Sequence, residues 1–448
     1  MNLLQEGTNV LAVELHQGRA SSSDIYLDFQ SLVLSSQEVD YSQMPLEQDT
    51  IALNLGADET QMSISWYAST DTPGLVAYAP ESAVQDGSLP ADAATVTASV
   101  SPTTRGGYWS HQLTLTGLEP DTTYVYQLTN HKNEETCTSE IATFTTGGGE
   151  QTSFLFVGDP QLGSSGNLDS DDGGWENTLN LAAQHFPDAT FLLSAGDQVD
   201  TASNETHYQA YLNHGVLRSL PQATTIGNHD SLNPDYTYHF NNPNATENGK
   251  TQAGGDYYYS YGAGLFIVLN TNNYNVAEHE KTIQEAIASA PDAAWRVVTI
   301  HQDIYGTGLD HSDTDGMILR TQLTPIFDKY DIDVVLQGHD HTNSRSKLLY
   351  GDGQTHGTYE FRLNADGSDY DWDNAFNTQT DEKVPLYPEE GDTASTALHD
   401  AFQADNGCYT IEDTTGNTVV NPKGTLYMTA NSASGSKFYE LIPTQQDY

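Results

Sequence analysis

The chain has 448 residues, 37% of them hydrophobic and 10% aromatic, which is enough for two or three domains with packed cores. Its 62 acidic and 15 basic residues give a formal net charge of −47, which argues against nucleic acid and anionic membranes as partners. No segment approaches the ~20 apolar residues of a membrane-spanning helix. The acids are spread along the chain, which favours a well-solvated protein in a salty or extracellular setting.

Residues 1–40 contain two strand-like runs joined by a polar loop. The run Gly7–His16 resembles the closing strands of a galactose-binding-like β-sandwich. Because a two-stranded piece is not stable alone, we predict a remnant of an upstream β-sandwich, with a hairpin docked on the next domain as the alternative. The chain would then be part of a longer exported product. This predicts an extracellular or cell-surface location, although the first residues form no signal peptide.

Residues 43–147 contain short strand-like runs at the spacing of a β-sandwich. Trp66 lies where such sandwiches bury a core tryptophan, and Leu118–Tyr124 resembles the tyrosine-corner segment of fibronectin type III domains. We therefore predict a fibronectin III-like domain that supports the rest of the chain, with carbohydrate, cell-wall or partner contact as the weaker alternative. The predicted strands are Thr50–Leu55, Met62–Ala68, Gly74–Ala79, Ala94–Ser99, His111–Leu118, Thr123–Thr129 and Ile141–Thr146.

Residues 151–448, after the predicted linker Gly147–Gly149, alternate apolar runs with helix-like segments. This alternation predicts an α/β domain with buried, parallel-type strands. The stretch from about 345 to 425 is polar and is predicted as an insertion over the rim of the site. Cys137 and Cys408 are too few for a disulfide scaffold, and the sequence leaves their pairing open. The predicted helices are Trp175–His185, Glu278–Ser289 and Met317–Tyr330.

Polar clusters stand where the apolar strands of this domain should end. Carboxylate, amide and imidazole groups gathered at the carboxyl ends of such strands are the ligands that a pair of divalent ions requires. Each cluster alone would indicate only a turn, but the set in this order indicates a two-metal hydrolase site. The clusters are Asp159-Pro160-Gln161, Gly196-Asp197-Gln198-Val199-Asp200, Gly227-Asn228-His229-Asp230, His301 and Gly338-His339-Asp340-His341.

The order and residue types of these clusters resemble the calcineurin-like metallophosphoesterases, and more narrowly the purple acid phosphatases, whose signature is GDxG, GDxxY, GNH(E/D), VxxH and GHxH. The resemblance implies a multidomain fold, in which an N-terminal β-sandwich precedes an α/β metallophosphoesterase domain whose β-sandwich core is flanked by helices. It also implies two divalent or trivalent metal ions, such as Fe, Zn or Mn. The implied ligands are Asp197 as the bridge, Asn228, His301 and His339 for one ion, and Asp159 and His341 for the other.

Catalytic and substrate-binding roles follow from the same resemblance. Asp197 would act through the bridged ions, and His229 would hydrogen-bond the phosphate ester or protonate the leaving oxygen, as a positioned imidazole can near neutral pH. Asn228 would also contact the substrate. His311, in the loop after the His301 strand, is a further candidate for substrate binding.

Two positions depart from the family pattern. Asp200 stands where the purple enzymes carry a metal-bound tyrosine, and Gln161 stands where the generic family has a ligand histidine. Without a tyrosinate we expect a colourless protein even with iron bound, which an absorbance spectrum free of a band in the purple region would verify. Gln161 can donate a neutral amide oxygen to the site of Asp159, which we expect to hold its ion loosely.

The local sequence pattern predicts the surroundings of several other polar residues. His185, His207, His214 and His279 lie in helix-like polar stretches and are predicted to be solvated. An anionic ester must approach an acidic chain, so Arg320 or Arg345 is expected to help the metal charge attract it.

The function predicted from these features is phosphomonoester hydrolysis by a metal-activated hydroxide, because two cations about 3.5–4 Å apart can activate water and neutralise phosphate charge. A phosphodiesterase or nucleotidase would keep every ligand and differ only in rim contacts. A non-catalytic surface module, with its site degraded at Gln161 and Asp200, is the second alternative. Turnover of matched monoester and diester substrates separates the three.

Overall fold

The computed structural model describes residues 40–148, 152–309, 311–312, 315–363, 371, 374–386, 388–389, 391–414, 416, 418–442 and 448. The predicted β-sandwich remnant at residues 1–40 lies outside this part of the chain, apart from Asp40. Two compact units can be distinguished among the described residues, one within His356–Gly407 and the other within Tyr41–Thr355 and Cys408–Tyr448.

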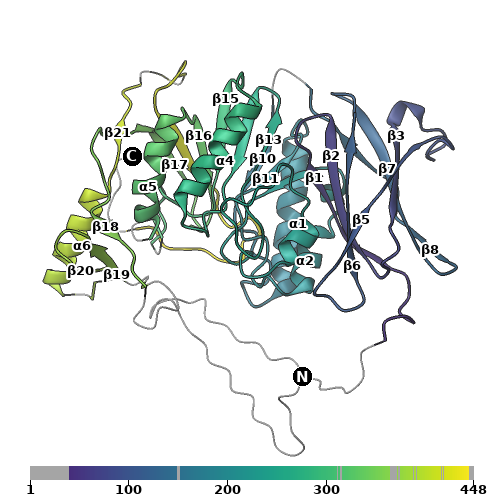
Figure 1. Cartoon of the computed structure of the whole chain (residues 1–448), viewed down its shortest axis with the longest axis horizontal. Coiled ribbons are helices and arrows are strands. Elements are labelled where there is room, and N and C mark those ends of the chain that lie inside the picture. Colours follow the sequence, from purple (N-terminus) through teal and green to yellow (C-terminus); the bar gives the residue numbers. More distant parts are fainter. Residues whose placement is uncertain are drawn as a thin grey trace, which may run out of the picture. The chain divides into compact units, whose positions relative to one another are not determined.

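The N-terminal part of the larger unit is a β-sandwich (Figure 1). One of its sheets contains β1, β2, β6 and β5, and the other has the order β4-β3-β7-β8 with β9 on β7. The predicted strand Ala94–Ser99 divides into β4 and β5, because β4 pairs with β3 and β5 pairs with β6 in the opposite sheet. The strands are β1 (Gln48–Leu55), β2 (Gln61–Ala68), β3 (Leu75–Pro80), β4 (Ala94–Thr97), β5 (Ser99–Pro102), β6 (Trp109–Thr116), β7 (Thr123–Lys132), β8 (Glu135–Thr138) and β9 (Ala142–Thr145).

The core of this sandwich contains the two aromatic residues that the sequence singles out. Trp66 is fully buried, and its Nε1–H donates to Asn130 Oδ1 over 2.8 Å. The hydroxyl of Tyr124 accepts the Glu119 N–H over 2.8 Å, which ties the turn before β7 to the strand. Both predictions about these side chains are confirmed. Cys137 and Cys408 do not form a disulfide bond with each other.

The first sheet of the sandwich continues into the next part of the chain. Strands β10 (Leu155–Val157), β11 (Leu192–Ser194) and β12 (Gln222–Thr224) are parallel neighbours, and β12 pairs with β1, giving the order β10-β11-β12-β1-β2-β6-β5. This pairing between residues far apart in sequence was not predicted. It ties the N-terminal sandwich to the strands that carry the first three polar clusters.

A second sheet carries the other clusters. Its order is β13-β14-β15-β16-β22-β17-β21, in which β14, β15, β16 and β22 are parallel and the outer strands antiparallel. The aromatic run Tyr257–Tyr259 lies in β13, at one edge of this sheet. The strands are β13 (Tyr257–Tyr261), β14 (Gly264–Val268), β15 (Trp295–Thr299), β16 (Val334–Gln337), β17 (Ser344–Tyr350), β21 (Thr410–Ile411) and β22 (Thr425–Thr429).

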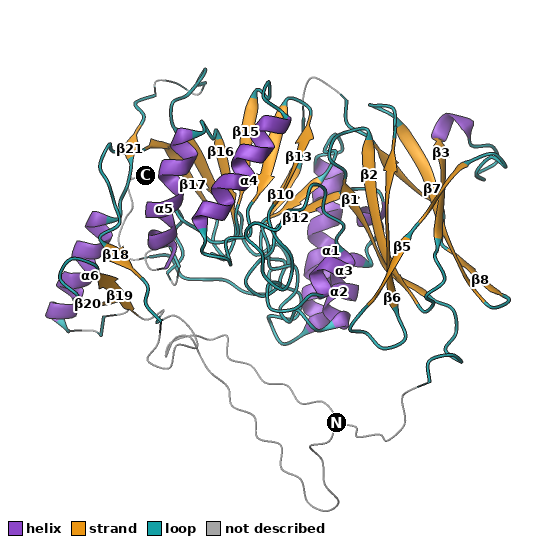
Figure 2. Cartoon of the chain, in the orientation of Figure 1, coloured by secondary structure: helices purple, strands orange, loops and turns teal. Residues whose placement is uncertain are grey.

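The two sheets face each other across an aromatic core that includes Phe191, Tyr259 and Phe266. Helices cover their outer faces (Figure 2). The first sheet packs against α1 (Leu168–His185), α2 (Glu205–Leu212) and α3 (Asp235–His239), and the second against α4 (Val276–Ser289) and α5 (Asp315–Lys329). The predicted fold class, a β-sandwich core flanked by helices behind an N-terminal sandwich, is confirmed.

The smaller unit, within the segment predicted as a polar insertion, has secondary structure of its own. Its sheet has the order β18 (Tyr359–Glu360), β19 (Asn374–Asn377) and β20 (Lys383–Pro385), and it is followed by α6 (Thr393–Asp405). The side chain of Asp392 accepts hydrogen bonds from Ala394 N and Ser395 N and so caps α6. Phe402 of α6 packs edge-on against Tyr359 of β18.

Three of the four histidines predicted to be solvated are not. His185 is exposed, but His279 is fully buried, His207 is nearly so, and the side chain of His214 is only 10% exposed. The prediction was wrong because helix faces that look polar in sequence are covered here: the His207 ring packs on Gly163, where an added Cβ would lie 2.2 Å from Cε1. His279 has a charged partner, Asp256.

His279 makes a buried ion pair with a pH dependence that can be tested. Nδ1 donates to both oxygens of Asp256, at 3.0 and 2.9 Å, and Nε2 donates to Asn273 O over 2.7 Å, so both nitrogens carry protons. Burial alone would lower the pKa of His279, but the hydrogen bond and charge of Asp256 outweigh it and raise the pKa.

The stability that this pair contributes is therefore fully present below the unfolded pKa of about 6.5 and is lost as pH rises through the higher folded pKa. We expect His279→Gln to lower the free energy of unfolding by about 3–5 kcal/mol at pH 6, because it leaves Asp256 buried without a countercharge. The difference from wild type should shrink by pH 9. Denaturant unfolding of the metal-free protein measures it, and a difference that grows with pH would contradict the assignment.

Candidate metal centre

The polar clusters meet at the carboxyl ends of parallel strands from both sheets. Asp159 follows β10, Asp197 follows β11, His301 follows β15, and His339 follows β16. Asn228 and His229 follow β12. Parallel strands bring their carboxyl ends to one edge, so residues separated by up to 180 positions become neighbours, as when the His339 N–H donates to Asp159.

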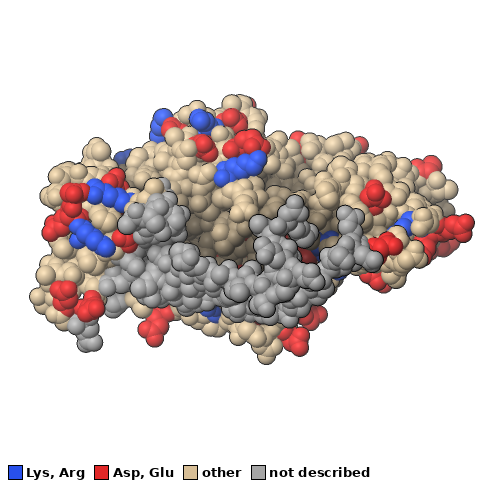
Figure 3. All heavy atoms as spheres, turned by 60° about the horizontal axis from the view of Figure 1, so that its bottom comes forward, with Lys and Arg blue, Asp and Glu red and all other residues tan. Residues whose placement is uncertain are grey.

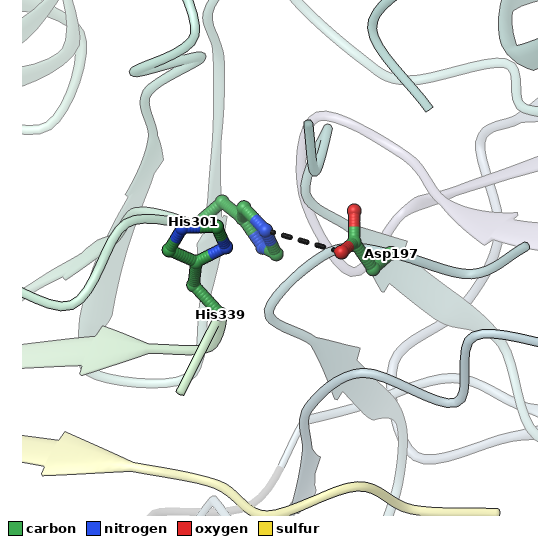
Figure 4. A group of neighbouring side chains, drawn as sticks. All are labelled: Asp197, His301 and His339. Atoms are coloured by element: carbon green, nitrogen blue, oxygen red, sulfur yellow. Dashed lines mark ion pairs between the residues drawn. The ribbon is translucent and has the colours of Figure 1, made fainter. Parts of the chain in front are cut away.

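Asp197, His301 and His339 form the centre of the site (Figure 4), with one donor atom of each lying within 4.8 Å of the others. His301 Nδ1–H donates to Ala195 O over 2.9 Å, which directs Nε2 toward Asn228 Oδ1 at 2.9 Å and Asp197 Oδ2 at 3.4 Å. Burial lowers the pKa of His301, but the charge of Asp197 outweighs it and raises this pKa to about 9. A proton therefore sits between two acceptors where a cation fits.

Asp159 and His341 lie on the other side of this centre. Both oxygens of the buried Asp159 accept the His339 N–H at 3.0 Å, and Oδ1 is 3.8 Å from His341 Nε2. Burial raises the pKa of Asp159 well above its usual value. His341 Nδ1–H donates to Lys437 O over 3.0 Å. Burial, with a contribution from the charge of Lys437, lowers the pKa of His341 to about 4, so its Nε2 lone pair is free of a proton at neutral pH.

His229 is held at the edge of the centre by three contacts. Its backbone N–H donates to Asp197 Oδ1 over 2.9 Å, and its Nδ1–H donates to Asp200 O over 2.6 Å. Nε2 then accepts from the Gln161 amide at 2.9 Å, and the same amide nitrogen is 3.3 Å from Asp200 Oδ1. The two residues that depart from the family pattern thus orient the imidazole that follows Asn228.

The backbone at the centre is strained in a way that fixes its side chains. Asp159, Gln161, Asp197 and His339 all have positive φ, at 47°, 39°, 49° and 68°, a region that non-glycine residues rarely adopt. Gly227 is needed for a different reason, since a Cβ there would lie 2.0 Å from Asp197 Oδ1. Gly338 is similarly crowded, since a Cβ there would lie 2.8 Å from Asp159 Oδ2, so close approach accounts for the glycine in the Gly-Asn and Gly-His pairs.

The residues present fit a pair of metal ions. Two buried carboxylates, an amide oxygen and three imidazoles form a donor set suited to divalent transition metals. The Oε1 atom of Gln161 is buried and has no hydrogen-bond partner among the described residues, which is unusual for a buried polar atom and is consistent with a ligand oxygen. The assignment of each residue to a particular ion stays a prediction.

Of two other candidate residues, the structure places one at the site and buries the other away from it. The ring of His311 lies 3.7 Å from that of His339, so His311 belongs to the site, although its role as a substrate ligand stays a prediction. Arg320 does not, because it is 1% exposed, donates to Ile304 O and Ser312 O, and stacks on Tyr305. The expectation that Arg320 attracts substrate was wrong.

Sequence reasoning missed the contribution of the C-terminal segment. The ring of Tyr439 lies 4.8 Å from that of His341 and 5.6 Å from that of His311, and Lys437 bonds His341 through its carbonyl. These residues follow His341 by almost a hundred positions and belong to none of the signature motifs. The only signal in the sequence is the run of small polar residues after β22, which is typical of a loop.

Comparison with known proteins identifies the families that two parts of this chain match. Residues 152–343 match the family of calcineurin-like phosphoesterases, and residues 48–146 match the N-terminal domain of purple acid phosphatases. The resemblance inferred from the motifs is thereby confirmed, and the site lies in a calcineurin-like phosphoesterase domain preceded by a purple acid phosphatase-type N-terminal domain. That family implies divalent metal ions at the site, without specifying which.

Among particular proteins, the chain is similar in fold to the purple acid phosphatase PPD1 from yellow lupin (Lupinus luteus) seeds, with a TM-score of 0.56, 16% identity, and coverage of 90% of this chain and 67% of that one. It is 27% identical over 279 residues to two uncharacterized proteins of Mycobacterium tuberculosis, Rv2577 and MT2654, which covers 53% of this chain. The chain spans about half the length of these curated relatives. No helix in the described part of the chain is long and apolar enough to cross a membrane.

Proposed function

We propose that this chain is a two-metal phosphoesterase that hydrolyses phosphomonoesters. The observation that supports this most directly is the convergence of Asp197, His301 and His339 with Asn228 at 2.9 Å from His301. When bound, two metal ions would activate a water, orient the phosphate and neutralise charge during in-line attack. The preference for monoesters rests on the resemblance to purple acid phosphatases.

The chain's own residues would hold the two ions and contact the substrate. Asp197, Asn228, His301 and His339 would hold one ion, and Asp159, His341 and Gln161 Oε1 the other, with Asp197 shared. His229 would contact the phosphate ester with Nε2, because Nδ1 is held by Asp200 O. When His229 carries a proton on Nε2, this nitrogen can no longer accept from the Gln161 amide, and it can donate the proton to the leaving oxygen instead.

The other parts of the chain have supporting roles in this proposal. Pairing of β1 with β12 joins the N-terminal sandwich to the strand that leads into Asn228, so we assign this fibronectin III-like domain to support. Carbohydrate or cell-wall contact through the β-rich part is a weaker assignment. We also propose an extracellular or cell-surface location, which suits the net charge of −47.

Turnover of an aryl phosphomonoester and the matching diester tests the proposal. The full chain is loaded with manganese, zinc or iron, and His339→Ala serves as control. Monoester turnover that the substitution abolishes supports the phosphatase. Turnover of the diester alone makes the protein a phosphodiesterase or nucleotidase. No turnover of either substrate by fully loaded protein overturns the proposal in favour of a non-catalytic module.

A further inference from the structure

The acidic surface poses a problem for binding of an anionic substrate. On the face drawn in Figure 3, acidic side chains are spread widely and basic ones are few. The whole chain has 15 basic residues against 62 acidic ones, and Arg320, the basic residue close to the His311 loop in sequence, is buried beneath Tyr305. A cation in contact with the metal centre would therefore have a large effect on phosphate binding.

The segment after β22 contains a lysine, Lys437, whose backbone carbonyl contacts His341 of the centre. It is anchored to the first motif, since Ala433 N–H donates to Gly158 O over 2.9 Å and Ser432 Oγ donates to Asp159 O over 3.3 Å. Ser434 Oγ also donates to Pro160 O. These bonds join the segment to the backbone around Asp159, so its position is set by the metal centre itself.

Lys437 and Tyr439 lie on the side of this segment that faces the site. The Lys437 carbonyl accepts from His341, its Nζ lies 5.0 Å from the centre of the Tyr439 ring, and that ring contacts His341 and His311. The alternate residues, Phe438 and Glu440, are exposed, with Phe438 66% accessible. Lys437 and Tyr439 are therefore more buried than their neighbours, and the ammonium group lies near the ring that contacts both histidines.

We propose that Lys437 binds the phosphoryl group of the substrate at the His341 side of the metal centre. This inference rests on the proposed function and extends it to a residue that binds the substrate. An ammonium is a strongly hydrated point charge on a flexible stem, which lets it follow a phosphate without a fixed geometry. Since a monoester phosphate carries more negative charge than a diester, Lys437 favours the monoester.

The test compares Lys437→Gln with Lys437→Arg and with Lys281→Gln, which removes a lysine from the exposed face of α4 and so changes net charge equally. Binding of inorganic phosphate to the metal-loaded protein is measured by calorimetry, and KM and kcat are measured for the monoester and the diester. All variants keep the backbone carbonyl that holds His341, so each should retain the wild-type metal content, which is measured as a check.

We expect Lys437→Gln to raise the phosphate Kd and the monoester KM about tenfold, the size of one charge-assisted hydrogen bond, with kcat within about twofold. The diester KM should rise less, and Lys437→Arg should stay within about threefold of wild type. The inference is overturned if Lys437→Gln changes phosphate binding no more than Lys281→Gln, or if arginine fails to replace lysine. If the wild-type protein turns over substrate and Lys437→Gln binds phosphate and substrate as wild type does, this inference alone is overturned. If the wild-type protein does not turn over substrate, the proposed function is overturned.

Discussion

Replacing Asp197 by asparagine is expected to lower turnover by about 10³-fold or more, because loss of the shared carboxylate removes several kcal/mol of metal-dependent stabilisation. Asp197 is buried, and although burial alone would raise its pKa, its neighbours outweigh this and lower it, above all through the charge of His301. Asparagine keeps an oxygen for the His229 N–H, so the fold should persist while the negative charge disappears.

Metal content per chain and the rise in Tm on addition of manganese measure this effect without relying on activity. Wild type should bind two ions and be stabilised by them, and Asp197→Asn should bind at most one and gain little. Asp188→Asn, at an exposed position, makes the same charge change and should behave as wild type. Retention of both ions by Asp197→Asn would show that Asp197 is not the shared ligand.

Replacing His229 by asparagine should have the second largest effect, a fall in kcat of about 10²–10⁴-fold, which is the usual contribution of a positioned acid or base. Its ring is held by Asp200 O at 2.6 Å and by the Gln161 amide at 2.9 Å, and none of its atoms is needed to complete the proposed ligand sets. Both ions should therefore remain bound in His229→Asn, which separates its role from that of Asp197.

A series of aryl phosphates with leaving groups of increasing pKa distinguishes proton donation from simple phosphate contact. If His229 protonates the leaving oxygen, the loss in kcat should grow as the leaving group becomes poorer, because an alkoxide requires a proton and an acidic phenolate does not. His185→Asn, at an exposed position on α1, is the matched control and should leave kcat unchanged. A loss that is equal for all leaving groups would assign His229 to binding instead.

Much of the centre could be predicted because its residues are placed by local sequence. Runs such as Val334–Leu336 have the apolar composition of buried strands, and glycine precedes four of the proposed ligands, as at Gly227, where the backbone closely approaches Asp197. Asp159 and His339 are 180 residues apart and yet meet, because both directly follow parallel strands. A motif at a strand end therefore predicts its neighbours in space.

The amino-acid sequence by itself determined the sandwich-and-α/β architecture and the residues able to ligate metal, because strand periodicity and strand-end chemistry are local properties. Only the tertiary structure decided the burial of His279 and Arg320, the hold of Gln161 on His229, and the place of Lys437 beside His341. Each of these depends on which surfaces meet when the sheets and loops pack. Lys437 and His341 lie 96 residues apart, and no periodic pattern spans that separation.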